Sequence, residues 1–305
     1  NLYPSPSSDF SVFDPKKLAT AQIGYFNVHG TEDGKEWYGQ KDPLENVSGP
    51  DFPVALKPAD LQHLQDVPRI IFCEACYGGH IFDKAESDSI ALTLLGKGVM
   101  AMIGSTTISY GSVNTPLIGA DLMGNLVLKN LRQGTSIGSA MVTAKAEFVR
   151  EMNRRQGYLD GEDQKTLISF VLYGDPLVAY DPYRASKRVM PRDLSQPYVK
   201  TMSDAAALDE QTEQLVPKMI SEAKSMVKGY LPGIDYAEVR VHNQQMNPVY
   251  VNKYGKAPVK STSTYSDHVT VSFSKQVTQA EKIHKQYARV TMDKQGKVVK
   301  LVVSR

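Results

Sequence analysis

The stretch RIIFCEACYGG, residues 69–79, decides the fold class of this chain. Residues 70–72 are apolar at every position, which is typical of a strand in a parallel sheet that is buried on both faces. The stretch ends in Cys76 and a pair of glycines, so a tight turn should follow the strand. We therefore expect an α/β domain whose chemistry lies beyond the carboxyl end of this strand.

Strands and helices alternate around this stretch up to about residue 180. Strands are expected at 22–28, 98–103 and 177–180, and helices at 88–95, 119–131 and 137–155. This alternation is typical of βαβ units. It predicts a mostly parallel sheet with helices on both faces.

The composition and the predicted secondary structure change after residue 183. Residues 184–203 are rich in Pro, Arg and Ser and are expected to form a linker. An amphipathic helix follows over 209–228, whose apolar face is expected to carry Leu215, Met219, Ala223 and Met226. Strands are expected at 237–242 and 268–273, and a hairpin over 287–303 with its turn at 293–296. The chain is therefore divided into an α/β portion (1–183), a linker (184–203) and a small α+β domain (204–305).

Composition excludes several classes of protein. The 305 residues include 35 basic and 33 acidic side chains, so the net charge of +2 does not indicate a nucleic-acid partner. No run of 18 apolar residues occurs, so no membrane span is expected. Cys73 and Cys76 are the only cysteines, which excludes a disulfide framework.

The charge is unevenly distributed. Residues 240–305 carry 12 basic and 3 acidic side chains, a local charge of +9 that leaves −7 for the rest of the chain. Opposite charges on two domains favour their association. We expect the C-terminal domain to dock on the acidic α/β portion and to restrain it.

The side chains that could take part in a reaction lie at the ends of two strands. His29 and Gly30 close the strand expected at 22–28, and Cys76 closes the next strand. Because neighbouring parallel strands end at one edge of a sheet, imidazole and thiol should lie together although they are 47 positions apart. An imidazole stabilises a nearby thiolate and can protonate a leaving amine. The amides of Gly30 and Cys76 could face a developing oxyanion.

These motifs resemble a known family. The sequences VHG at 28–30 and EACYGG at 74–79 are similar to the histidine and cysteine motifs of the caspase–hemoglobinase superfamily. Within it, the chain most resembles the gingipain-like family of bacterial cysteine peptidases. The stretch IGSTTISY at 103–110, the helix after Pro116 and the turn LYGDPL at 172–177 extend the resemblance over residues 20–182.

The resemblance implies a cysteine endopeptidase with a caspase-like fold, in which residues 1–183 are the catalytic portion. It makes Cys76 the nucleophile that forms a thioester, His29 the general acid/base, and the amides of Gly30 and Cys76 the oxyanion site. It requires no organic cofactor. It also implies protein or peptide substrates and a secreted or cell-surface location in a bacterium.

Three further residues are expected to contact the substrate. Tyr110 would line the pocket for the side chain before the scissile bond, with Gly111 and Glu74 beside it. Gly111 stands where gingipains have a large aromatic residue, which leaves the side-chain preference open.

The resemblance also implies strands and helices before the histidine strand, and the 28 residues before His29 cannot supply them. We expect them in a segment outside this chain, either an associated N-terminal fragment of the same precursor or a part lost by truncation.

Other interpretations compete with the peptidase. A caspase-like fold can serve as a non-catalytic binding or scaffold protein. The sequence GTSIG at 134–138 fits a serine-hydrolase motif, although Ser136 is better interpreted as a helix N-cap. Cys73 and Cys76 have the spacing of a redox pair, and with His80 they would offer three zinc ligands; Cys73 is better explained as a small buried apolar residue.

An acidic cluster formed by Asp160, Glu162 and Asp163 has two interpretations. Its carboxylates could hold a structural calcium ion. The simpler prediction is a solvated loop.

Overall fold

The computed structural model describes residues 13–42, 48–180, 199–205, 207–208, 210–246, 265–279 and 282–304. Its first sheet has the strand order β1-β5-β6-β8. The strands β1 (Ile23–Phe26), β5 (Ile70–Cys73) and β6 (Ala101–Ser105) are parallel, and β8 (Phe170–Gly174) runs antiparallel to β6.

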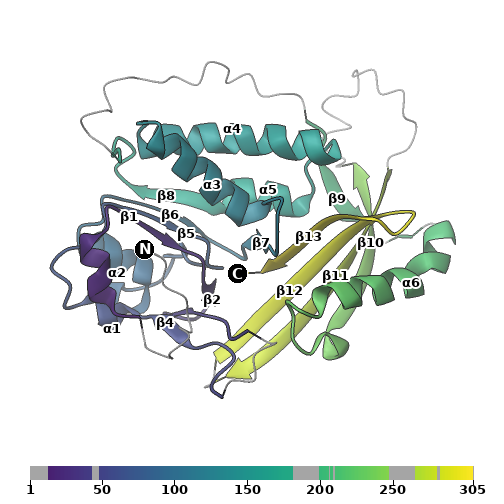
Figure 1. Ribbon diagram of the computed structural model, residues 1–305, viewed down its shortest axis with the longest axis horizontal. Coiled ribbons are helices and arrows are strands. Elements are labelled where there is room, and N and C mark those ends of the chain that lie inside the picture. The colour runs from purple at the N-terminus through teal and green to yellow at the C-terminus, as the bar shows by residue number, and fades with distance from the viewer. Residues whose placement is uncertain are drawn as a thin grey trace.

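Helices cover both faces of this sheet. Successive side chains of β5 point to opposite faces, so alternate residues pack against different helices. Ile70 and Phe72 pack with α3 (Gly119–Arg132) and α4 (Ile137–Gln156). Ile71 and Cys73 pack with α1 (Pro58–Leu61) and α2 (Ile90–Gly96) on the other side (Figure 1). The expected α/β class is confirmed.

A small antiparallel sheet stands beside the first one. It consists of β2 (His29–Gly30), β3 (Trp37–Tyr38) and β4 (Val54–Leu56). The expected strand over 22–28 was therefore wrong in its final part, because β1 ends at Phe26 and His29 pairs with Tyr38 in the other sheet.

The third sheet is antiparallel, with the order β7-β13-β12-β11-β10-β9. It contains β9 (Met202–Ala205), β10 (Glu238–Met246), β11 (Tyr265–Gln279), β12 (Lys282–Asp293) and β13 (Val298–Ser304). The helix α6 (Glu210–Val227) packs on it through Met219 and Ala223, as the helical spacing predicted, and Leu215 is partly buried beside them. Met226, expected on the same face, is exposed. The short helices η1 (Pro15–Thr20), η2 (Glu86–Asp88) and η3 (Ile234–Tyr236) complete the described elements.

The α+β character of the C-terminal region agrees with the sequence, but this sheet crosses the expected domain boundaries. Its edge strand β7 (Tyr110–Ser112) belongs to the catalytic portion, and β9 spans the boundary at residue 204. Figure 1 shows β13 reaching across to β7. Residues 184–198 of the expected linker lie outside the described residues.

Two finer expectations changed. Residues 177–180 do not form a strand; Ala179 makes an isolated bridge to Ser136, and β8 closes the sheet instead. The region 161–169 folds as α5 (Gly161–Ser169), which begins at an N-cap on Asp160. None of the helices in the described ranges combines the length and apolar character that a membrane span requires.

Candidate active site

The cysteine loop after β5 is a tight turn held against β6. Tyr77 has a φ of 57°, a left-handed conformation that bends the chain directly after Cys76. The N–H of Tyr77 donates to the carbonyl of Thr107 at 2.9 Å, and that of Gly79 to Ser105 at 2.8 Å. A Cβ on Gly79 would lie 2.7 Å from the carbonyl oxygen of Gly104. Glycine is therefore needed for the loop to approach β6.

The sulfur of Cys76 faces the backbone just before β7. The N–H of Ser109 donates to Sγ at 3.2 Å, and the thiol lies 3.5 Å from the Ser109 carbonyl oxygen. An N–H aimed at sulfur stabilises a negative charge there. Cys76 is 3% exposed, so a substrate cannot reach this sulfur without a movement of its surroundings.

His29 is oriented by two neighbours. Its Nε2 lies 2.7 Å from Oε1 of Gln40, so the amide oxygen accepts a hydrogen bond from a protonated Nε2. Its ring meets the ring of Phe52 edge to face, with centroids 5.5 Å apart. The Gln40 contact favours the tautomer that leaves Nδ1 unprotonated, which is the state of a proton acceptor.

The histidine strand and the cysteine loop touch through Gly30. A Cβ on Gly30 would lie 2.1 Å from the carbonyl oxygen of Cys76, so the two backbones are in direct contact. A hydrogen bond lies close to this contact: the hydroxyl of Tyr77 donates to the carboxylate of Glu32 at 3.3 Å. Gly30 and Cys76 are thus brought together across 46 positions of sequence.

Tyr110 and Gly111 lie on β7, directly after the residue that contacts the sulfur. Tyr110 is 9% exposed, and Nζ of Lys165 lies 5.8 Å from the centre of its ring. Burial lowers the pKa of Lys165, and attraction to Cys76 opposes this. A half-buried cation therefore stands near the sulfur and the expected pocket wall.

A comparison with known protein families agrees with this geometry. The model of Peptidase family C25 matches residues 23–180, slightly more than half of the chain. The chain belongs to Peptidase family C25. It is thus a gingipain-like cysteine peptidase by family. No curated protein and no solved structure matches it.

The other cysteine of this C25 family member is part of the core. Cys73 is fully buried between the sheet and α2, and burial raises the pKa of its thiol above the usual range. Both cysteines are free thiols. No cluster of metal-ligating side chains occurs in the described ranges, so the zinc interpretation gains no support from them.

Glu74, expected to contact the substrate, is buried in the core. Its side chain is fully buried, and its Oε1 accepts a hydrogen bond from the hydroxyl of Tyr25. A Cβ on Gly124 in α3 would lie 3.3 Å from the same oxygen. This carboxylate therefore links the end of β5 to β1 and lies close to α3, and its full burial does not support a substrate contact.

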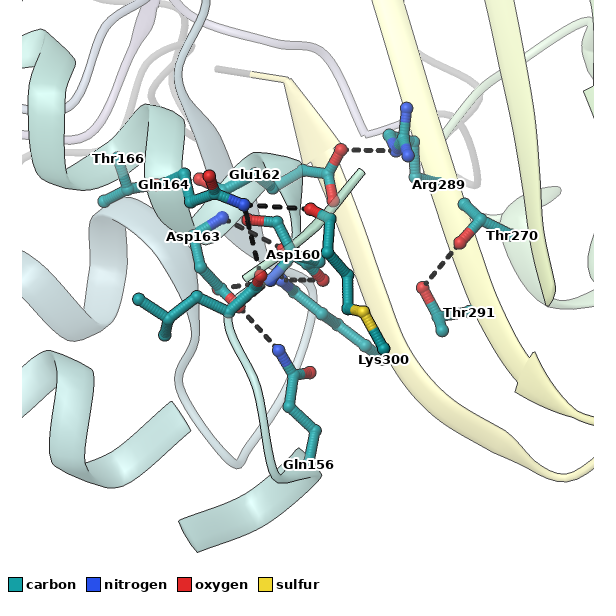
Figure 2. Close-up of polar contacts among 12 residues, drawn as sticks. Gln156, Asp160, Glu162, Asp163, Gln164, Thr166, Thr270, Arg289, Thr291 and Lys300 are labelled. Carbon is teal, nitrogen blue, oxygen red and sulfur yellow. Dashed lines mark hydrogen bonds and ion pairs between the residues drawn. The ribbon is translucent and has the colours of Figure 1, made fainter. Parts of the chain in front are cut away.

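The acidic cluster is neither solvated nor arranged around a cation site of its own; the prediction of a solvated loop was wrong. Asp160, Glu162 and Asp163 are buried. Nζ of Lys300 on β13 lies 2.7 and 2.8 Å from the two carboxylate oxygens of Asp160 and 2.8 Å from Asp163. Arg289 on β12 pairs with Glu162 at 2.6 Å. Figure 2 shows these carboxylates turned toward the two basic side chains of the C-terminal sheet.

Ser136 is a helix N-cap, as expected. Its hydroxyl accepts the N–H of Ser139 at the start of α4, and the segment 134–138 joins two helices rather than a strand and a helix. The geometry of a serine-hydrolase turn is therefore missing at this described segment.

Sequence reasoning missed three residues of the site: Ser109, Gln40 and Lys165. Ser109 lies in the stretch 103–110 that extends the family resemblance, but nothing in that stretch distinguishes it from its neighbours. Gln40 and Lys165 are ordinary polar residues, and no motif marks them. Only the folded chain brings them to Cys76 and His29.

Proposed function

We propose that this family C25 protein is an endopeptidase that cleaves peptide bonds through Cys76 and His29. The observation that carries the proposal is the contact of Gly30 with the carbonyl of Cys76, which joins the two motifs at one point. The donor from Ser109 and the orienting oxygen of Gln40 are what a thiolate and its acid/base partner require.

The chemistry follows from these positions. The thiolate of Cys76 attacks the peptide carbonyl carbon, and the amides of Gly30 and Cys76 stabilise the oxyanion. His29 donates a proton to the leaving amine, which departs as the carbonyl re-forms in a thioester. His29 then accepts a proton from water, whose oxygen attacks the thioester and releases the acid and Cys76.

The partners follow from this function. We propose protein or peptide substrates, a secreted or cell-surface location in a bacterium, and an N-terminal fragment of the precursor beside β1. In support of the last point, β1 pairs with β5 alone among the described strands and borders a groove of 540 Å³.

An alkylation assay tests the catalytic pair. Iodoacetamide is added to the full chain, and mass spectrometry compares labelling of Cys76 and Cys73. We expect Cys76 to react about tenfold faster or more, because it is the activated thiol. The substitution His29→Ala should remove the difference, whereas His63→Ala, which alters an exposed histidine, should not.

A scaffold protein is the second candidate, and the 3% exposure of Cys76 favours it. A scaffold needs no activated thiol. Equal and slow labelling of both cysteines, unaffected by His29→Ala, would support the scaffold and reject the peptidase.

A further inference from the structure

Strand β7, next to Cys76, has both of its edges occupied. On one side Tyr110, Gly111 and Ser112 pair with β13. On the other side Gly111 forms a bridge to Gly119 at the start of α3. A peptide that is to lie along β7 as an added strand must therefore displace one of these neighbours.

Of the two neighbours, β13 is the one that can be displaced. Gly119 is held within the catalytic core, because a Cβ on it would lie 2.2 Å from the carbonyl oxygen of Tyr110. By contrast, only the last three described residues of β13 pair with β7, and β13 has β12 as its other neighbour.

The direction of β13 is that of a substrate. Val302 lies opposite Ser112 and Ser304 lies opposite Tyr110, so the strand runs with its carboxyl end toward Ser109. Ser109 is the residue whose N–H reaches the sulfur of Cys76. The residues before a scissile bond must run toward the attacking sulfur in this same direction, because their last carbonyl carbon is the one attacked.

The C-terminal domain also covers the histidine side of the site. Gln279 at the end of β11 brackets Phe52: its amide donates to the Phe52 carbonyl at 2.7 Å, and its oxygen accepts the Phe52 N–H at 3.1 Å. The ring of His284 on β12 stacks on Phe52 with centroids 4.6 Å apart. Phe52 in turn contacts His29.

A buried ionic cluster fixes β13 in this place. Lys300, two residues before the pairing segment, is bound by Asp160 and Asp163, and all three side chains are at most 2% exposed. Arg289 adds pairs to Glu162 and Asp204. The acidic side chains of the catalytic portion and the basic side chains of the C-terminal domain thus meet beside β13, the strand that pairs with β7.

We propose that β13 is an internal occupant of the position where an extended peptide substrate lies, so that the folded chain is latent until β13 leaves β7. The proposal rests on the peptidase function proposed above and adds its regulation. The same backbone groups of Tyr110–Ser112 cannot bind β13 and a substrate together, so turnover is reduced to the fraction of molecules in which β13 has left.

The test compares two proline substitutions in β13 of the full chain. Val303→Pro lies in register with both Gly111 of β7 and Ala288 of β12, and it weakens the pairing of this end of β13, since proline has no N–H and cannot continue a ladder. Val299→Pro is the matched control, because Val299 is 38% exposed and lies outside the β7 register. The probes are an equimolar mixture of tripeptidyl acyloxymethyl ketones, for labelling of Cys76, and unfolded casein, for turnover.

We expect Val303→Pro to raise both rates about tenfold or more over the wild-type chain, and Val299→Pro to leave them unchanged. Unchanged rates in both variants, with labelling still dependent on His29, would overturn the role of β13 and leave the peptidase standing. Absence of His29-dependent labelling, with iodoacetamide as well, would reject the peptidase and the latent state with it.

A second measurement needs no variant. Hydrogen exchange of the amides at 302–304 is compared between wild-type protein alkylated with the tripeptidyl ketones and the same protein alkylated with iodoacetamide. A bound peptide should expose these amides, whereas the small acetamide group should not. Equal protection in the two adducts would overturn the proposal even if Val303→Pro fails to fold.

Discussion

Replacing Lys300 by methionine tests whether the buried ionic cluster holds the C-terminal sheet to the catalytic portion. The substitution keeps an unbranched side chain of similar length and removes the charge. It leaves the buried carboxylate of Asp160 without its cation and Asp163 without its contact to Nζ. We expect the free energy of unfolding to fall.

The size of the loss can be derived in two ways. Removing one partner of a buried ion pair costs about 3–5 kcal/mol. Alternatively, the orphaned carboxyl takes up a proton. Burial opposes the charge of Asp160, but Lys300 lowers its pKa below the usual 3.8, and protonating a carboxyl of ordinary pKa costs about 4 kcal/mol at pH 7. The two routes agree on a loss of about 4 kcal/mol.

The assay is urea unfolding at pH 7, followed by the fluorescence of Trp37, the only tryptophan, and by far-ultraviolet circular dichroism. Lys297→Met is the matched control, because Lys297 is exposed at the turn before β13. Adding Asp160→Asn and Asp163→Asn to Lys300→Met should recover part of the loss, since neither position then holds a buried carboxylate that lacks its cation. A loss below about 1 kcal/mol, the range of surface ion pairs, would refute the reasoning.

Three further predictions concern the site and the cluster. Gly30→Ala should reduce turnover about 100-fold, because its Cβ would push the histidine strand away from the Cys76 carbonyl. Gln40→Glu should extend the pH–rate profile to higher pH, because a carboxylate beside His29 stabilises the imidazolium. Burial and the neighbouring Asp160 raise the pKa of Asp163 to about 8 from its usual 3.8. Its contribution to stability is therefore complete below about pH 4 and is lost as the pH rises to 8, so the free energy of unfolding should fall over this range. Asp163→Asn should remove this pH dependence, measured by urea unfolding between pH 5 and 8.

Each of these predictions has a control or a contradicting outcome. Gly229→Ala, where an added Cβ meets nothing within 4 Å, should leave turnover unchanged. An identical pH–rate profile in Gln40→Glu would show that Gln40 has no positioning role. Parallel stability curves for the wild type and Asp163→Asn would contradict the proton held by Asp163.

The sequence was informative where structure is local. The apolar run before Cys73 predicted a strand buried on both faces, and the helical spacing of Met219 and Ala223 predicted the buried face of α6. The turn over 293–296 was also expected, and Gly296 has the positive φ of 86° that the turn requires. In each case a few neighbouring residues determine the conformation.

The remaining features depend on residues far apart in the chain. Tyr110–Ser112 is a three-residue strand whose partner lies about 190 positions later, too short a segment to show a period. The sequence around Asp160 and Asp163 indicates solvent-exposed side chains, because their partner Lys300 lies about 140 positions later in the chain. His29 does not continue the expected strand, because it pairs with Tyr38 in a strand of two residues, which is too short to show a hydrophobic pattern.

The ionic cluster and the occupied strand are physically connected through register. A slip of β13 by one residue would turn Lys300 to the opposite face of the sheet, and a slip by two would move it by about 7 Å. Either slip would leave a buried charge unpaired, at a cost of several kcal/mol. Lys300 therefore fixes which residue of β13 lies opposite Tyr110, and so sets how far the strand reaches toward Cys76. An apolar residue at this position could pack as tightly, but it would penalise a shifted strand far less.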